Sequence, residues 1–312
     1  MISELQKRIT ALKLKTNTAI LAHSYQREEI LEIADYCGDS FMLAQHALNT
    51  AEKKMLICGV HFMAETAKIL NPNKRVFLAN REAGCPMADC LSGEELKRIR
   101  ESEPDRMVVC YINTAADVKK QSDVCVTSSS AVKIIKKIKE QKILFVPDSN
   151  LGRYVASQAP EKDIKCFSGC CPYHDGASID DAEKAKRLYP FAKLLVHPEC
   201  RPEVTDIADF IGSTSEIMNY AKASPCGEFI VGTEISIAEH LSYHLPDKRF
   251  YPLSKKILCP EMKLTSLPDV YNTLSDIEKN KSSAFELVMD SEYIAAAKKC
   301  IDKMLELGSA EN

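Results

Sequence analysis

The chain has 312 residues, of which 45% are hydrophobic and 27% are charged, and its formal net charge is -3. This length predicts two or three globular domains, because a domain typically holds about 100–200 residues. The nearly balanced charge gives no basic surface for nucleic acid, and no apolar run is long enough to cross a membrane.

The N-terminal segment MISELQKRITALKLKTN alternates charged and apolar residues. This pattern predicts a short amphipathic helix and lacks the continuous apolar core of a secretory signal. We therefore expect a cytoplasmic protein, whose 13 cysteines are not a disulfide framework. In a reducing compartment, cysteine serves as a small buried hydrophobe, a metal ligand or a redox thiol.

Short apolar runs rich in β-branched residues alternate with segments of helical periodicity. The predicted strands are 18–22, 55–60, 76–79, 107–112, 143–146, 164–167, 194–196, 229–231 and 250–253. The predicted helices are 28–36, 63–69, 131–139, 216–223, 237–243 and an amphipathic helix at 291–307. Strands that alternate with helices predict an α/β fold, in which helices cover both faces of parallel sheets.

One unit occurs three times in the chain, with three predicted strands before a Cys-Pro pair. The corresponding positions are His23, Tyr111 and His197, then Ser40, Ser128 and Thr214, then Cys85, Cys171 and Cys259, and each step is 86 or 88 residues. This period is longer than the roughly 20–50 residues of a solenoid repeat. It predicts a triplicated small domain with units at 1–90, 91–176 and 177–264, followed by a helical tail at 265–312 that packs on the body.

Polar residues occupy matching places at the predicted strand ends. His23, Tyr111 and His197 follow strands directly, where parallel α/β sheets bind their ligands. The hydroxyl residues one turn later, Ser40, Ser128 and Thr214, are predicted to cap helices, whose first N–H groups also bind anions. Capping alone would explain any one of them, but three in register favour a shared anionic ligand.

Three cysteines from distant loops suit a metal better than a disulfide. A zinc site would need a fourth ligand, for which His174 and Cys90 are candidates. An iron–sulfur cube held by three thiolates would leave one iron open to act as a Lewis acid. Spacing does not choose between these metals, although the chain lacks the tight C-x-x-C-x-x-C run of a ferredoxin. Other cysteines are predicted to be core residues (Cys37, Cys58, Cys110, Cys125 and Cys166) or surface thiols (Cys200 and Cys226).

At these residues the chain resembles the quinolinate synthase family. The segments that carry the resemblance span about residues 20–260: Ala22-His23-Ser24-Tyr25, Gly38-Asp39-Ser40, Gly84-Cys85-Pro86-Met87-Ala88, Tyr111-Ile112-Asn113, Cys171-Pro172-Tyr173-His174, His197-Pro198-Glu199-Cys200, Gly212-Ser213-Thr214-Ser215, Gly232-Thr233-Glu234, Phe250-Tyr251-Pro252-Leu253 and Cys259-Pro260. Any one of them alone would be weak, and together they are specific.

The resemblance implies three pseudo-threefold-related, Rossmann-like three-layer domains around a central cavity. It implies one 4Fe–4S cluster bound by Cys85, Cys171 and Cys259. It also implies a transferase of NAD biosynthesis that condenses iminoaspartate with dihydroxyacetone phosphate to quinolinate, with loss of phosphate and water. The open iron would bind substrate and assist dehydration, and an iminoaspartate-producing enzyme would be the metabolic neighbour.

The residues at the strand ends suit substrates that carry carboxylates and a phosphate. The predicted substrate-binding residues are His23, Ser40, Tyr111, Asn113, Ser128, His197, Glu199, Ser213 and Thr214. The predicted catalytic residues are Tyr25, Tyr111, His174 and Glu199, since proton transfer during condensation and dehydration needs groups that donate and accept protons.

One departure from the family pattern, and one parallel ambiguity, leave alternatives for the ligand cysteines. Cys170 adjoins Cys171, and Cys90 follows Cys85, so the repeat register is what selects Cys171 and Cys85 as ligands. Three other interpretations of the chain are a different iron–sulfur hydro-lyase, an iron–sulfur sensor and a structural zinc protein. The sensor would need an output segment that the sequence does not show, and neither it nor the zinc protein needs an anion-lined cavity.

Overall fold

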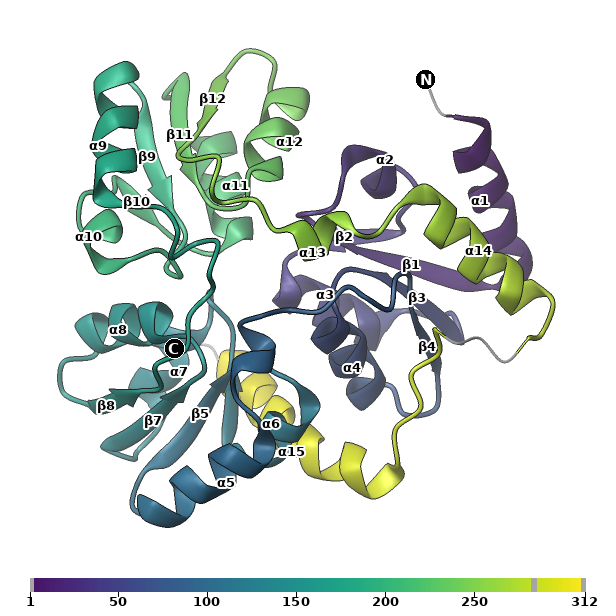
Figure 1. The fold of residues 1–312 in the computed structure, drawn as a ribbon, viewed down its shortest axis with the longest axis horizontal. Helices are drawn as coiled ribbons and strands as arrows, with labels where there is room; N and C mark the ends of the chain where they lie inside the picture. Colours follow the sequence, from purple (N-terminus) through teal and green to yellow (C-terminus); the bar gives the residue numbers. More distant parts are fainter. Residues whose placement is uncertain (1–2, 282–284, 310–312) are drawn as a thin grey trace.

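The computed structural model describes residues 3–281 and 285–309, and it consists of three lobes around a common centre (Figure 1). Each lobe holds one four-stranded parallel sheet. The first sheet, in the order β2-β1-β3-β4, contains β1 (Thr18–His23), β2 (Tyr36–Gly38), β3 (Lys54–Cys58) and β4 (Arg75–Leu78). The second, in the order β6-β5-β7-β8, contains β5 (Met107–Tyr111), β6 (Val124–Val126), β7 (Lys142–Val146) and β8 (Asp163–Cys166). The third, in the order β10-β9-β11-β12, contains β9 (Lys193–Val196), β10 (Phe210–Ile211), β11 (Glu228–Gly232) and β12 (Arg249–Pro252).

Helices connect the strands in every lobe. The first lobe has α1 (Glu4–Thr16), α2 (Glu28–Leu31), α3 (Ser40–Asn49), α4 (His61–Leu70) and the 3-10 helix η1 (Ala88–Cys90). The second has α5 (Gly93–Ser102), α6 (Ala116–Lys120), α7 (Ala131–Lys137) and α8 (Ser149–Gln158). The third has α9 (Ile179–Leu188), α10 (Pro202–Thr205), α11 (Thr214–Ala223), α12 (Ser236–His244) and α13 (Pro260–Lys263), and the C-terminal segment adds α14 (Leu267–Glu278) and α15 (Ser291–Ser309).

Helices cover both faces of the first sheet, which explains why its strands are apolar on both sides. Neighbouring residues of β1 point to opposite faces, and Ile20 packs with Ile9 of α1 and Leu274 of α14. Leu21 packs instead with Leu43 of α3 on the other face. The predicted α/β fold with three parallel sheets is therefore confirmed.

The C-terminal segment joins two of the lobes. Helix α14 lies beside α1 in the first lobe, and α15 packs against α6 and β6 of the second (Figure 1). Ala297, Cys300, Ile301 and Met304 of α15 are fully buried in the core of that second lobe. Burial of this apolar stripe fixes α15 to the body.

The three lobes repeat one hydrogen-bonding device that the sequence analysis did not find. In each lobe, an aspartate just before the short edge strand forms two hydrogen bonds with one residue of the neighbouring central strand. Its carboxylate accepts the backbone N–H of that residue, and its own backbone N–H donates to the carbonyl of the same residue. The pairs are Asp35 with Ile20, Asp123 with Val108 and Asp209 with Leu194, at N···O distances of 2.8–3.0 Å. The aspartates are 88 and 86 residues apart, so they keep the register of the repeat.

Several sequence predictions need correction. The predicted helix at 28–36 is only the four-residue α2, because Asp35 then turns the chain into β2. The three short edge strands β2, β6 and β10 were missed, since two or three residues are too few to show a period. Cys37 is exposed because it lies on edge strand β2, whereas Cys200 is buried rather than a surface thiol. Cys166 and Cys226 are half-buried, and Cys58, Cys110 and Cys125 are core residues as predicted.

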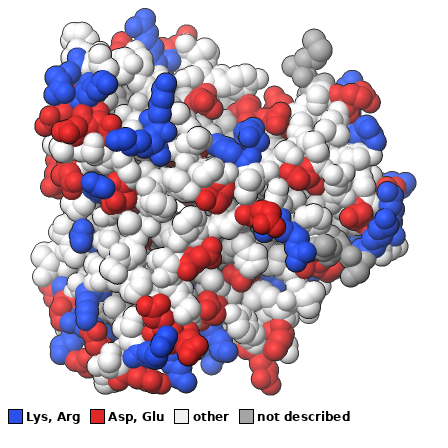
Figure 2. Space-filling model, in the orientation of Figure 1, with Lys and Arg blue, Asp and Glu red and all other residues white. Residues whose placement is uncertain are grey.

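Charges of both signs are interspersed over the face shown in Figure 2, in keeping with the small net charge of the chain. Among the helices that the structure describes, none is both long enough and apolar enough to span a bilayer.

We expect Asp123→Ala to lower the free energy of unfolding by about 1–3 kcal/mol, because the buried Val108 N–H loses its acceptor. Denaturant unfolding followed by circular dichroism measures this change. The control is Asp302→Ala, which removes an exposed ion pair with Lys298 within α15 and should cost less than about 0.5 kcal/mol. Equal effects of the two substitutions would show that the aspartate device is not a stabilising element.

Candidate metal centre and active site

A cavity lies where the carboxyl ends of strands from all three lobes meet. Residues predicted for the site line it together: His23, Tyr25, Ser40, Cys85, Tyr111, Asn113, Ser128, Cys171, His174, His197, Glu199, Thr214 and Cys259. Ser213, which the structure describes at the start of α11, is not part of this lining. The parallel sheets therefore gather side chains that are more than two hundred residues apart in sequence.

The predicted capping of helices by Ser40, Ser128 and Thr214 is wrong. Ser40 and Thr214 are the first helical residues of α3 and α11, and the residues before them, Asp39 and Ser213, accept the capping N–H groups. Ser128 lies outside α7, two residues before the N-cap residue Ser130. The hydroxyls of Ser40 and Thr214 are thereby free to bond elsewhere in the cavity.

His23 and His197 have the same environment in the first and third lobes. The Nδ1 atom of His23 accepts the Tyr25 N–H at 3.1 Å, and that of His197 accepts the Glu199 N–H at 3.2 Å. Burial lowers the pKa of each imidazole to about 4. Both rings are therefore neutral at pH 7 and carry their proton on Nε2, so each offers one N–H donor.

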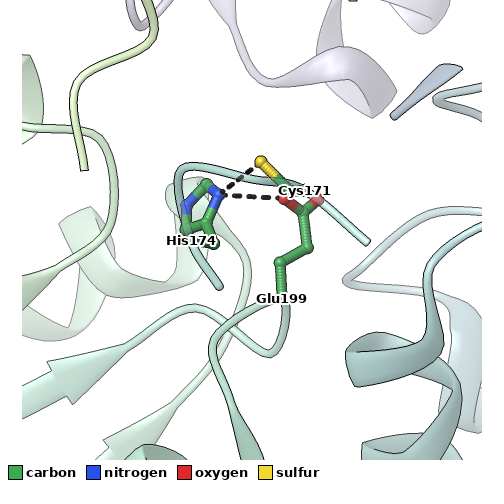
Figure 3. Close-up of side chains that lie close together, drawn as sticks. All are labelled: Cys171, His174 and Glu199. Carbon is green, nitrogen blue, oxygen red and sulfur yellow. Dashed lines mark hydrogen bonds and ion pairs between the residues drawn. The ribbon is translucent and has the colours of Figure 1, made fainter. Parts of the chain in front are cut away.

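Glu199 is an acid of the cavity whose two carboxylate oxygens contact different lining side chains. It accepts the Tyr111 hydroxyl at 2.7 Å through Oε1, and its Oε2 lies 3.0 Å from His174 Nδ1 (Figure 3). The same Nδ1 is 3.3 Å from Cys171 Sγ. Burial alone would raise the pKa of Glu199, but His197, His174 and the Tyr111 hydroxyl outweigh it and hold this pKa below its usual range.

The three cysteines predicted as ligands occupy equivalent turns. Burial raises the pKa of Cys85 to about 12, and it also raises the pKa values of Cys171 and Cys259. In each turn the backbone N–H three residues further on bonds the sulfur and lowers the pKa of the thiol. These N–H groups belong to Ala88, His174 and Met262 respectively. Such N–H groups stabilise a thiolate, which is the form that binds metals.

A carboxyl group also accepts the backbone N–H of each cysteine. Asp89 accepts that of Cys85 at 3.3 Å, Asp148 that of Cys171 at 2.9 Å, and Glu234 that of Cys259 at 3.4 Å. These acids were not among the residues predicted for the site. Asp148 and Glu234 are 86 residues apart, so the repeat register could have revealed them. The first lobe has Val60 at the equivalent position, 88 residues before Asp148, and uses Asp89 instead.

The donor set fits a metal group larger than one ion. A tetrahedral zinc with bonds of about 2.3 Å holds its sulfurs about 3.8 Å apart. Among the described residues, the side chains whose ligand atoms all lie within 4.8 Å of one another are Cys171, His174 and Glu199, so the sulfurs of the three cysteines do not all lie within that distance. Three thiols around a wider space suit a cluster with several metal atoms. Cys171, His174 and Glu199 could themselves hold a single ion.

The cavity has an unusual charge pattern for an anion-binding site. Its acids are Asp39, Glu199 and Glu234, and none of the described residues that line it is lysine or arginine. An anionic ligand in this cavity would therefore depend on N–H and O–H donors. Ser40 and Asn113 already form such a polar pair, with Ser40 Oγ donating to Asn113 Oδ1 at 3.1 Å.

Together, the fold and the site define an α/β protein with three lobes and one shared, cysteine-lined cavity. Residues 7–306 match the family model described as quinolinate synthetase A protein. The chain is 46% identical over 307 residues to a quinolinate synthase of Caldicellulosiruptor bescii, covering 98% of this chain and 99% of the relative. It is 45% identical over 311 residues to that of Aquifex aeolicus, covering 98% and 95%. A protein named quinolinate synthase 2 from Methanosarcina acetivorans is 44% identical over 299 residues, covering 96% and 94%. The chain belongs to the quinolinate synthetase A family.

We expect the affinity of the metal-free protein for a thiophilic metal to increase with pH. The raised pKa of Cys85, about 12, means that metal binding must displace a proton throughout the neutral range. For each proton that metal binding displaces, the affinity should rise by a further factor of roughly ten per pH unit. Cobalt titrations followed by thiolate absorption between about pH 6.5 and 9 measure it, and Cys85→Ser should give a shallower slope. An affinity independent of pH would contradict the assignment of these thiols as ligands.

Proposed function

We propose that this chain is a quinolinate synthase, which condenses iminoaspartate with dihydroxyacetone phosphate and releases phosphate and water. The observation that carries this proposal is the meeting of Cys85, Cys171 and Cys259 in one cavity together with His174 and Glu199. Family membership supports it, because relatives that match over nearly their whole length bear the name quinolinate synthase. We also propose that the protein works in the cytoplasm, beside an enzyme that supplies iminoaspartate.

We propose that the three cysteines bind one 4Fe–4S cluster. When bound, it would supply an iron without a protein ligand, which is a Lewis acid for carboxylate or hydroxyl oxygens. This assignment is supported by the sulfurs, which do not all lie within 4.8 Å of one another, and by the backbone N–H group that bonds each one. The carboxyl acceptors of the cysteine N–H groups would keep the loops in place while the cluster is inserted.

The neutral donors of the cavity would bind the substrate anions. His23 and His197 each offer an Nε2–H, and Ser40, Asn113, Ser128 and Thr214 offer hydroxyl or amide groups. Donors without charge hold a carboxylate or a phosphate yet release the product more readily than buried lysines would. Ser213 is left out of this set because its hydroxyl caps α11.

In this proposal, Glu199 and the residues bonded to it carry out the acid/base catalysis. Its depressed pKa keeps Glu199 ionised, so it can accept a proton from a substrate carbon or hydroxyl. His174 and Tyr111 bond to it directly and would orient its two oxygens. Burial and the charge of Glu199 raise the pKa of both Tyr25 and Tyr111, so these phenols remain protonated and serve as hydrogen-bonding groups.

Anaerobic reconstitution tests the central proposal. We expect about four iron and four sulfide per chain, and quinolinate formation from iminoaspartate and dihydroxyacetone phosphate. Cys171→Ser should lose both the iron and the activity. Cys170→Ser, one residue away and outside the cavity lining, is the matched control and should keep both. A loaded cluster without quinolinate would favour another hydro-lyase, and bound zinc without iron would contradict the cluster.

We expect Glu199→Gln to lower kcat by about 100- to 10,000-fold while iron content is kept, because the amide cannot take up a proton. Tyr111→Phe removes one hydrogen bond to the same carboxylate and should have a smaller effect. Steady-state kinetics of both variants at matched iron content measure the difference. Unchanged turnover of the glutamine variant would remove Glu199 from the acid/base group.

A further inference from the structure

A second cavity lies at the boundary between the first and third lobes. It has a volume of about 530 Å³ and shares no described lining residue with the central cavity. Residues of α2, β2 and α3 line it together with residues of α11 and α12. Its described lining contains Glu28, Glu32, His240 and His244 but no lysine or arginine. The chemistry of this lining therefore suits a positively charged ligand.

Two histidines of α12 converge on one carboxylate of the first lobe. His240 and His244 are four residues apart, so they lie on the same face of the helix. His240 Nδ1 is 2.5 Å from Glu28 Oε2, and His244 Nε2 is 3.3 Å from Glu28 Oε1. Two histidines at this helical spacing, together with a carboxylate, form a ligand set that binds zinc.

The second ring nitrogen of His240 fixes the protonation of the first. Nε2 of His240 is 3.0 Å from the backbone carbonyl of Gln26, which can only accept, so Nε2 carries the hydrogen. In the neutral imidazole, Nδ1 then presents a lone pair to the Glu28 carboxylate, which also only accepts. Two acceptors at this distance need a cation between them. Histidines that bind metals commonly donate their other N–H to a carbonyl in this way.

A proton is the simplest cation that could lie between these atoms. A His240 that carries hydrogen on both nitrogens would pair with Glu28, and its side chain is only 4% exposed. Such a proton accounts for His240 alone. A divalent ion accounts for both histidines, for the carboxylate that joins them and for the acidic cavity beside them.

We propose that Glu28, His240 and His244 bind one divalent transition-metal ion, such as Zn²⁺, between the first and third lobes. Water from the cavity would complete the four ligands that zinc prefers. The two histidines bond different oxygens of Glu28, and the three ligand atoms do not all lie within 4.8 Å of one another. The side chain of His244 is 59% exposed, so its ring can turn toward His240 when the ion binds.

An ion at this place would hold a turn that also serves the central cavity. The segment after β1 carries Tyr25, which lines the central cavity, and reaches Glu28 three residues later. A bond from Glu28 through the ion to α12 would fix this segment against the third lobe. The inference stands apart from the proposed function, because none of the three ligands lines the central cavity.

Isothermal titration of the cluster-loaded enzyme with zinc tests the site. We expect one zinc ion per chain in addition to the iron of the cluster. His244→Ala should lower the zinc affinity at least about 100-fold, because even the loss of an outer partner of a ligand costs about 10- to 100-fold. Glu28→Gln should lower it at least about tenfold, since the amide has no charge. The exposure of His244 makes its removal harmless to the core.

The melting temperature gives a second measurement that does not depend on turnover. Zinc at about 100 times its Kd should raise the melting temperature of the wild type by roughly 3–8 °C, because the ion binds only the folded chain. His244→Ala should lose this increase. A proton shared by His240 and Glu28, with no metal, would give the same melting temperature with and without zinc, and would overturn the inference.

His61→Ala is the matched control. His61 is an exposed histidine of α4 whose Nδ1 is 3.7 Å from Glu65, but the described lining of its cavity has no second histidine. This variant should keep the wild-type zinc affinity and the wild-type increase in melting temperature. A wild type that binds no zinc, or equal zinc affinities in the wild type and His244→Ala, would overturn the inference.

A cluster-free chain separates this inference from the proposed function. In the combined variant Cys85→Ser, Cys171→Ser and Cys259→Ser, the central cavity has lost its three predicted thiol ligands. We expect this chain still to bind one zinc ion, and to lose it when His244→Ala is added. That result would support the zinc site even if the wild type took up no cluster or made no quinolinate. Zinc binding that is unchanged by His244→Ala in this chain would overturn the site and leave the proposed function intact.

Discussion

The structure depends on one geometric constraint, the convergence of the carboxyl ends of three parallel sheets on a single point. A parallel sheet presents its strand-end side chains along one edge, so one lobe alone supplies only a shallow row of polar groups. Three lobes facing one another turn these rows into an enclosed cavity. The turns that carry the three cysteines are held by carboxyl groups, each of which accepts the backbone N–H of one cysteine. These acceptors are Asp89, Asp148 and Glu234. Without those carboxyl groups, the three cysteine N–H groups would lose the side-chain acceptors that hold their turns.

Electrostatics explains why the cavity contains neutral donors. Three acids line it, and the described lining has no lysine or arginine to balance them. Burial keeps His23 and His197 uncharged, and the carboxylate of Glu199 is stabilised by its histidine and tyrosine neighbours. A metal group bound by the three cysteines would supply positive charge to a described lining that otherwise has acids and thiols but no lysine or arginine.

The nine longer strands were predicted to within two residues, because most of them are runs of buried β-branched and aliphatic residues. It failed at β2, β6 and β10, whose two or three residues carry no readable period. It assigned capping to Ser40 and Thr214, whereas the residues before them cap the helices. A helix boundary off by one residue cannot be detected from propensity alone, since Asp, Ser and Thr are all favoured at these positions.

The sequence by itself determined the repeat, the α/β class and the matching positions of Cys85, Cys171 and Cys259, because periodicity and spacing are properties of the chain. The tertiary structure alone decided which distant groups touch. Thr233 shows the difference: its segment contributes to the family resemblance, but only the structure shows that it bridges Tyr25 and His174, which are 208 and 59 residues away along the chain. Such contacts arise from the packing of three separate lobes. The identity of a hydrogen-bond partner across a lobe boundary depends on distances of a few ångströms, which no local pattern of residues encodes.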